Sequence, residues 1–192
     1  EIKVEDRELD KMTVGKGLMT LVDQERQQEL LGHLEDHLVK ASHASGGSAG
    51  NSMIATAQFG GPTFMSCKVA NDSDGDIYIA DMEAAGVDHC LTGEREEGTT
   101  GKCLVLISPD AERSMNTNLS ISETLSEEQL VPGAITQSEY LYIEGYLVTS
   151  PTGRAAAIKA KSIAEEAGVK TSISFSDPGM VEFFREGMEE MV

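Results

Sequence analysis

The sequence predicts an α/β fold: a mostly parallel sheet flanked by helices, with a small antiparallel β-flap beside it. Three helical patterns, in residues 51–61, 76–86 and 151–168, each end at a glycine and have a short apolar run nearby. Strands that alternate with helices indicate βαβ units and a parallel sheet. Residues 1–22 and 88–118 lack this alternation, and their apolar runs favour strands joined by a hairpin.

The composition is that of a globular domain of moderate size with a small appendage. The chain has 192 residues, of which 40% are hydrophobic and 25% charged. A net charge of -18 opposes unspecific attraction to nucleic acid or to anionic membranes. No apolar run reaches the ~20 residues that span a bilayer, and no signal segment opens the chain. We therefore expect a cytoplasmic protein that binds neither nucleic acid nor membrane.

The first long helix is expected over residues 23–41, with Asp23 as its N-cap. Its apolar residues recur at helical spacing: Leu30, Leu31, Leu34 and Leu38. His33 and His37 are four residues apart on this helix, but no metal-binding pattern frames them, so they are expected to be surface histidines.

Strands are expected at residues 63–69, 140–143 and 169–175. The helix over residues 151–167 carries a narrow stripe of small residues, which suits close packing on a sheet. The stripe consists of Ala156, Ala160, Ile163, Ala164 and Ala167.

Three cysteines, Cys67, Cys90 and Cys103, are widely spaced and form no C-x-x-C pair. Neither a zinc ribbon nor a disulfide framework is indicated, so the thiols are expected to be reduced. Cys67 and Cys103 lie in apolar runs and are predicted to be small core residues.

Acidic residues cluster over residues 71–76. Calcium binding is disfavoured, because placing Gly75 at position 6 of an EF-hand loop puts Ala70, which offers no ligand, at position 1. A helix-capping turn with Asp74 or Asp76 as the cap is the better interpretation.

A glycine-rich stretch over residues 45–52 is the most informative segment. Gly46 and Gly47 allow close backbone approach to a ligand, and Asn51 offers a donor and an acceptor at the start of a helix. Taken alone, the stretch fits a ligand-binding loop and a purely structural turn equally well.

Several stretches together resemble the PfkB family of carbohydrate kinases. G-G-S-A-G-N at residues 46–51 is similar to the first signature of the family, and residues 101–117 resemble the lid hairpin of adenosine-kinase-like members. Y-I-E-G-Y-L at residues 142–147 resembles the strand end that reaches the sugar site. The resemblance runs from about residue 12 to the end. It departs at Met53 and Ala70, where the family has a small residue and a glycine.

The resemblance implies a ribokinase-like fold whose β-lid closes over a sugar or nucleoside. The lid is expected over residues 1–22 and 88–118, and the α/β body over 23–87 and 119–192. The expected acceptor-binding residues are Gly46, Gly47, Asn51 and Glu144, with Arg113 and Asn116 as weaker candidates in the lid. An apolar lid face, formed by Leu104 and Leu106 or by Val105 and Ile107, makes a homodimer through the lid plausible.

The implied activity is transfer of a phosphoryl group from ATP, with Mg²⁺, to a hydroxymethyl group of adenosine, a related nucleoside or a sugar. The Asn-x-x-Glu and Gly-Ala-Gly-Asp motifs that carry this chemistry in the family do not occur in residues 1–192, and no catalytic or metal-binding residue is assigned. We expect the base, an Asp, to lie beyond Val192 with the C-terminal part of the fold, and the 192-residue chain alone to be inactive. The alternative is a non-catalytic ligand-binding or dimerising module.

Overall fold

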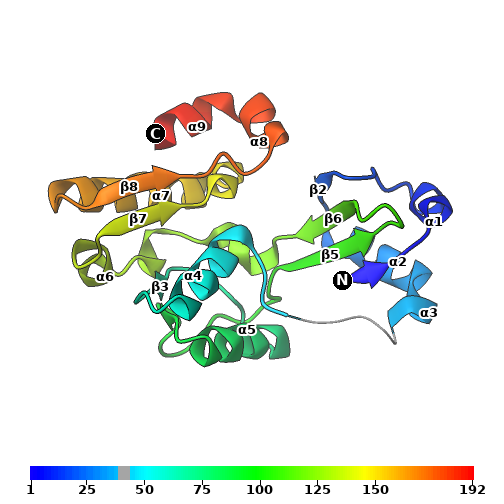
Figure 1. Ribbon diagram of the computed structural model, residues 1–192, viewed down its shortest axis with the longest axis horizontal. Helices are drawn as coiled ribbons and strands as arrows, with labels where there is room; N and C mark the ends of the chain where they lie inside the picture. Colours follow the sequence, from blue (N-terminus) through cyan, green and yellow to red (C-terminus); the bar gives the residue numbers. More distant parts are fainter. Residues whose placement is uncertain (39–43) are drawn as a thin grey trace.

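A computed structural model describes residues 1–38 and 44–192, which form a lid and a larger α/β body (Figure 1). The lid is a four-stranded sheet in the order β1-β5-β6-β2. Its strands are β1 (Ile2–Lys3), β2 (Met19–Leu21), β5 (Lys102–Ile107) and β6 (Arg113–Asn118). The hairpin of β5 and β6 is antiparallel, as predicted, but β1 and β2 pair parallel to their neighbours.

The mixed pairing corrects the prediction of a wholly antiparallel flap. β1 and β2 lie at opposite edges of the sheet, and the helix α1 (Asp6–Lys11) with the loop after it connects them. β1 runs parallel to β5, and β2 runs parallel to β6 on the other side of the hairpin. The two outer strands therefore form no hairpin with each other.

The lid has a hydrophobic core of its own. Helix α2 (Gln24–His33) and α1 cover one face of the sheet, and Leu30, Leu34 and Leu106 are almost completely buried there. Leu104 packs against the same cluster, so the apolar face with Leu104 and Leu106 is covered within the chain. That face gives no reason for a second copy to cover it.

The helix predicted over residues 23–41 is divided. Asp23 caps α2 by accepting from the Arg26 amide at 2.8 Å, as predicted. The helix ends at Leu34 and is followed by α3 (Glu35–Leu38), while residues 39–41 lie outside the described residues. By packing, α2 lies with the lid, whereas the sequence placed it with the body.

The body contains two parallel strand pairs, each connected through a helix. β3 (Phe64–Met65) pairs with β4 (Asp88–His89), and β7 (Tyr140–Ile143) pairs with β8 (Lys170–Ile173). β7 has the bounds expected from the sequence, whereas β3 and β8 are shorter than expected. β4 belongs to the body and not to the flap, because it hydrogen-bonds to β3.

Helices surround these strands. The body helices are α4 (Ser48–Gln58), α5 (Ser73–Ala84), α6 (Pro132–Thr136), α7 (Pro151–Glu166), α8 (Pro178–Phe183) and α9 (Arg185–Met191). The predicted stripe of α7 is buried at Ala156, Ala160 and Ala164. In the described residues, no helix is long and apolar enough to cross a membrane.

The cap of α5 is Asp72, not Asp74 or Asp76. Its carboxylate accepts from the Gly75 amide at 2.8 Å and from the Thr100 hydroxyl and amide at 2.6 and 2.9 Å. Asp74 instead forms an ion pair with Lys102 at the start of β5. Asp72 thus joins α5 to Thr100, two residues before the lid hairpin begins.

A local turn follows the other strand of the hairpin. Asn118, the last residue of β6, is buried, and its side-chain oxygen accepts from the Ser120 amide at 3.1 Å. Asp72 therefore ties the start of the ribbon to α5, whereas Asn118 stabilises the turn that follows its end.

We expect Asp72→Asn to lower the free energy of unfolding by about 1–2 kcal/mol, because an amide cannot accept every hydrogen bond that this carboxylate accepts. Burial opposes ionisation of Asp72, but the hydrogen bonds from Thr100 and Gly75 outweigh it and hold its pKa below the usual value. The stabilisation that ionised Asp72 contributes to the folded protein is present above the unfolded-state pKa of about 3.9. It is lost as pH falls towards the lower folded-state pKa.

Urea unfolding at neutral and acidic pH measures this effect, with Asp88→Asn, at an exposed position, as control. The deficit of Asp72→Asn relative to the unmodified protein should shrink below about pH 4. A deficit that is the same at every pH would contradict the assignment.

Candidate functional site

A carboxylate surrounded by hydroxyl groups lies where three body elements meet. Glu144 directly follows β7, and its Oε2 accepts from the Tyr142 hydroxyl at 3.3 Å and from the Ser48 hydroxyl. Its Oε1 accepts from the Ser176 hydroxyl at 2.6 Å. Ser48 begins α4, and Ser176 lies beyond the end of β8, so the three donors come from separate segments. The carboxyl ends of neighbouring parallel strands are where open α/β sheets bind ligands.

The residue after Glu144 brings these segments together. A Cβ on Gly145 would overlap with the Ser174 carbonyl oxygen and lie 2.9 Å from the Ser176 hydroxyl oxygen. Only glycine allows this close approach, because any side chain would push the two strand exits apart. Ser176 itself has a φ of 64°, and this turn directs its hydroxyl back to Glu144.

The start of α4 is open on its outer side. Gly47 is the N-cap with φ 85°, and both Gly46 and Gly47 are exposed with no atom within 4 Å of a would-be Cβ. The Ser45 amide donates to Asp81 Oδ2 at 2.8 Å, which anchors the loop to α5. A ligand can therefore approach the backbone of this loop closely.

The charge of Glu144 is balanced by polar groups and not by a cation. No basic side chain in the described ranges forms an ion pair with Glu144. The amides at the start of α4 favour a negative charge nearby. Burial and the charge of Glu144 raise the pKa of Tyr142, so its hydroxyl stays protonated and able to donate. This set of donors and one acceptor carboxylate is suited to a ligand with several hydroxyl groups.

The structure brings four of the predicted residues towards one place. Gly46, Gly47 and Asn51 lie at the start of α4, whose first residue, Ser48, contacts Glu144. Asn51 follows Ser48 by three positions, so the two share one side of the helix. Its side chain is exposed and has no hydrogen-bond partner in the described part of the chain.

The two lid residues are not brought to this place together. Residues of β6 alternate between the two faces of the lid sheet. Arg113 is exposed, whereas Asn116 is buried on the face that α1 and α2 cover, opposite Leu104. Its amide nitrogen has no partner among the described residues.

The uncovered face of the lid lies towards the body. Met19 of β2 packs against the body cluster that contains Ile143 and Val148. Cys103 of β5 lies near Tyr146, whose pKa is raised by burial and by the 2.7 Å hydrogen bond to Asp177. Cys103 is exposed, and this corrects its prediction as a core residue, because β5 turns it away from the lid core.

Sequence reasoning missed Ser48, Tyr142 and Ser176. The first two lie inside the motifs that carried the resemblance, so the sequence pointed to their segments but not to their roles. Ser176 carries no comparable signal, because only the fold brings residues 144 and 176 together.

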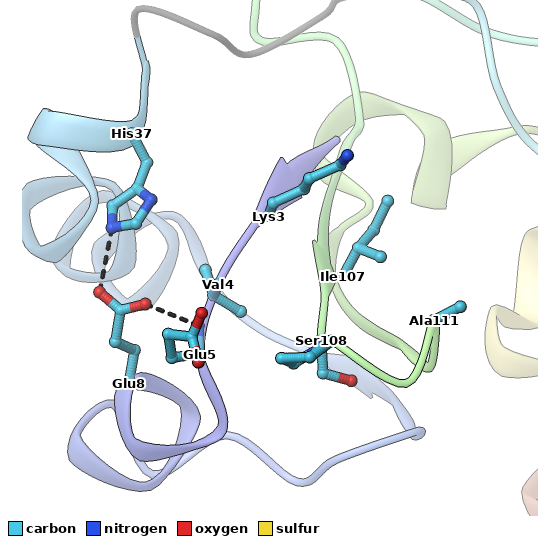
Figure 2. Close-up of a pocket in the computed structure, with 9 residues that line it drawn as sticks. Lys3, Val4, Glu5, Glu8, His37, Ile107, Ser108 and Ala111 are labelled. Carbon is cyan, nitrogen blue, oxygen red and sulfur yellow. Dashed lines mark hydrogen bonds and ion pairs between the residues drawn. The ribbon is translucent and has the colours of Figure 1, made fainter.

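A hollow of about 370 Å³ lies elsewhere, within the lid (Figure 2). None of the six predicted site residues lines it. Its polar groups pair with each other: His37 Nε2 lies 3.0 Å from Glu8 Oε1, and the Glu5 amide donates to Glu8 Oε2 at 2.7 Å (Figure 2). The Glu5 amide and, after it, His37 hold the pKa of Glu8 below its usual value. Because Glu8 is already satisfied, this hollow is a weaker ligand site than the surroundings of Glu144.

Comparison with known proteins identifies the family. The sequence profile described as pfkB family carbohydrate kinase matches residues 11–192. The chain belongs to the pfkB family. The ribokinase-like arrangement predicted from the sequence is thereby confirmed, including the mostly parallel body sheet flanked by helices.

Individual pfkB relatives agree with this assignment. An adenosine kinase from Sinorhizobium meliloti is 31% identical and superposes with a TM-score of 0.88, covering 99% of this chain and 57% of that one. A probable sugar kinase from Rhizobium etli CFN 42 is 30% identical with a TM-score of 0.86, covering 96% and 56%. An ATP-dependent ribose-1-phosphate kinase from Halopiger xanaduensis is 32% identical over 71% of this chain and 43% of its own length. The chain thus spans about half the length of these relatives.

Kinases of this family use ATP, and magnesium is expected with it. The described residues contain no group of three or more His, Cys, Asp or Glu side chains that could hold a metal ion. We assign no metal ligand or phosphate-binding residue among the described residues.

We expect Gly145→Ala to lower the free energy of unfolding by about 1–3 kcal/mol, because the added methyl group overlaps with the backbone at Ser174. Gly32→Ala is the matched control. Gly32 lies within α2 with open space around a would-be Cβ, so alanine there should stabilise the protein by about 0.5–1 kcal/mol. Thermal unfolding of both variants measures the difference, and equal midpoints would contradict the close approach at Gly145.

Proposed function

We propose that the full-length protein is an ATP-dependent kinase that phosphorylates a hydroxymethyl group of adenosine, a related nucleoside or a sugar. The acceptor lies between the start of α4 and Glu144. The observation that supports this proposal is the convergence of three hydroxyl donors from separate segments on the Glu144 carboxylate. Membership of the pfkB family and the 31% identity to an adenosine kinase support the reaction class.

The carboxylate recognises the acceptor by exchanging hydrogen bonds. Ligand hydroxyl groups replace donors such as Ser48 on Glu144, and each charge-assisted hydrogen bond contributes about 1.5–3 kcal/mol. Asn51, one turn further along α4, supplies a donor and an acceptor to a neighbouring hydroxyl. An acceptor that lacks one hydroxyl leaves a polar group unpaired, and this is the basis of selection among sugars.

The glycine loop and the lid complete the acceptor site in this proposal. Gly46 and Gly47 leave room for the sugar beside the backbone, and the uncovered face of the lid shields it from water. Arg113 is exposed and lies on the uncovered face of the lid sheet, opposite to the face of Asn116, so it is a candidate donor to the acceptor. Asn116 does not contact the acceptor in this proposal, because it is buried on the opposite face of the same sheet.

We expect Glu144→Gln in the full-length protein to raise the KM for the acceptor at least about tenfold, with little change in the KM for ATP. The amide keeps the size of the side chain but loses its charge and one acceptor oxygen. Glu166→Gln, at the exposed end of α7, is the control. Coupled ADP-release assays with adenosine, ribose and other sugars measure the effect, and thermal unfolding checks that each variant is folded.

A ligand series makes the test specific. Removing the ribose hydroxyl that Glu144 binds should weaken acceptor binding to the unmodified protein but have little further effect in Glu144→Gln, because both changes delete the same interaction. If the losses of binding free energy were additive for every hydroxyl, Glu144 would not be a residue of the acceptor site. Binding without ATP-dependent turnover in the unmodified protein would favour the non-catalytic binding module.

A further inference from the structure

Two cysteines lie against each other at the carboxyl ends of β3 and β4. The Cys67 amide donates to Cys90 Sγ at 3.3 Å, and the Cys90 sulfur lies 3.2 Å from the Cys67 carbonyl oxygen. Cys67 is buried and Cys90 is half-buried.

The strand register explains this contact. Phe64 pairs with Asp88 and Met65 with His89, and the Cys90 amide continues the ladder by donating to the Met65 carbonyl at 3.1 Å. In a parallel ladder the next donor, the Cys67 amide, bonds to the backbone carbonyl of residue 90. Here it bonds to the Cys90 sulfur instead. The Cys90 sulfur therefore lies directly against the Cys67 backbone, within reach of the Cys67 side chain.

Solvent reaches the pair through a hollow. Cys67 and Cys90 both line a depression of about 120 Å³ that Lys68, Thr92 and Arg95 also border. A small oxidant such as hydrogen peroxide, comparable to two water molecules of ~30 Å³ each, fits in this space.

We propose that Cys67 and Cys90 are a thiol pair that a peroxide oxidises reversibly to an intramolecular disulfide. The Cys90 thiolate attacks one peroxide oxygen, so that an S–O bond forms, the O–O bond breaks and the departing hydroxide takes up a proton. The Cys67 sulfur then attacks the Cys90 sulfenic acid, forms the S–S bond and expels water together with the Cys67 proton. The two sulfurs lose two electrons in total, and the peroxide becomes two waters.

The environment assigns different roles to the two thiols. Hydrogen bonds from the Cys67 thiol and amide stabilise the Cys90 thiolate against burial and lower the pKa of Cys90 to about 7. The neighbouring Cys90 and burial raise the pKa of Cys67. Cys90 is thus the nucleophile, and Cys67 resolves the sulfenic acid.

Peptide mapping of the full-length protein tests the proposal independently of any kinase activity. After treatment with hydrogen peroxide, remaining thiols are alkylated with iodoacetamide, and the digest is analysed by mass spectrometry. We expect loss of alkylation at Cys67 and Cys90, recovery of their two peptides as one cross-linked species, and return of both thiols on reduction. Cys103 has the Thr117 hydroxyl, and no second cysteine, as its hydrogen-bond partner in the described residues, so it serves as the internal control and should form no cross-linked peptide.

Two variants separate the steps. Cys67→Ser should stop the reaction at a Cys90 sulfenic acid that dimedone traps, and Cys90→Ser should leave Cys67 alkylatable. Full alkylation of Cys67 and Cys90 in the unmodified protein after peroxide, or a Cys90 that pairs only between molecules, would overturn the proposal. Because these readouts need no substrate, failure of the proposed kinase activity would not affect them.

Discussion

The contact between the exits of β7 and β8 at Gly145 determines where a ligand site can form in this chain. It places Glu144 and Ser176 on facing segments, and the fold adds Ser48 from the start of α4. Each of these groups belongs to a different element, so no local segment contains the site. The hydroxyl cluster around the carboxylate is therefore a consequence of how closely two backbones approach, and a glycine is what permits that approach.

The lid is organised differently from the body. Its core is built from α1 and α2, so one face of its sheet is satisfied within the lid itself and the other face lies towards the body. The contact of Met19 with the body cluster is apolar, whereas the start of the hairpin is joined to α5 by the polar contact of Thr100 with Asp72. Apolar contacts between preformed surfaces can separate without leaving unpaired polar groups. Breaking a buried hydrogen bond, by contrast, leaves its donor and its acceptor unpaired.

Sequence patterns predicted the elements that depend on local periodicity and on capping residues. The strand at residues 140–143 and the Asp23 cap are examples, and a helix after the two glycines was expected, although it begins at Ser48 and not at Asn51. Features that depend on distant partners were missed or misassigned. Asp72 was passed over as the cap because Thr100, 28 residues away, completes its hydrogen bonds. Ser176 was missed since only the turn at positive φ directs it to Glu144, and the direction of β1 and β2 depends on which hairpin strand each of them pairs with.

The anchored start of the lid ribbon restricts how the lid can be displaced. Because Thr100 is held by Asp72 of α5, the strand that enters the lid does not rotate freely at its base. The ribbon is an antiparallel ladder of six residue pairs from Lys102–Asn118 to Ile107–Arg113. Displacement of the lid is therefore distributed as small changes of twist and bend over this ladder. The stiffness of the ribbon, set by the side chains along both of its faces, then determines how far the lid moves relative to the body.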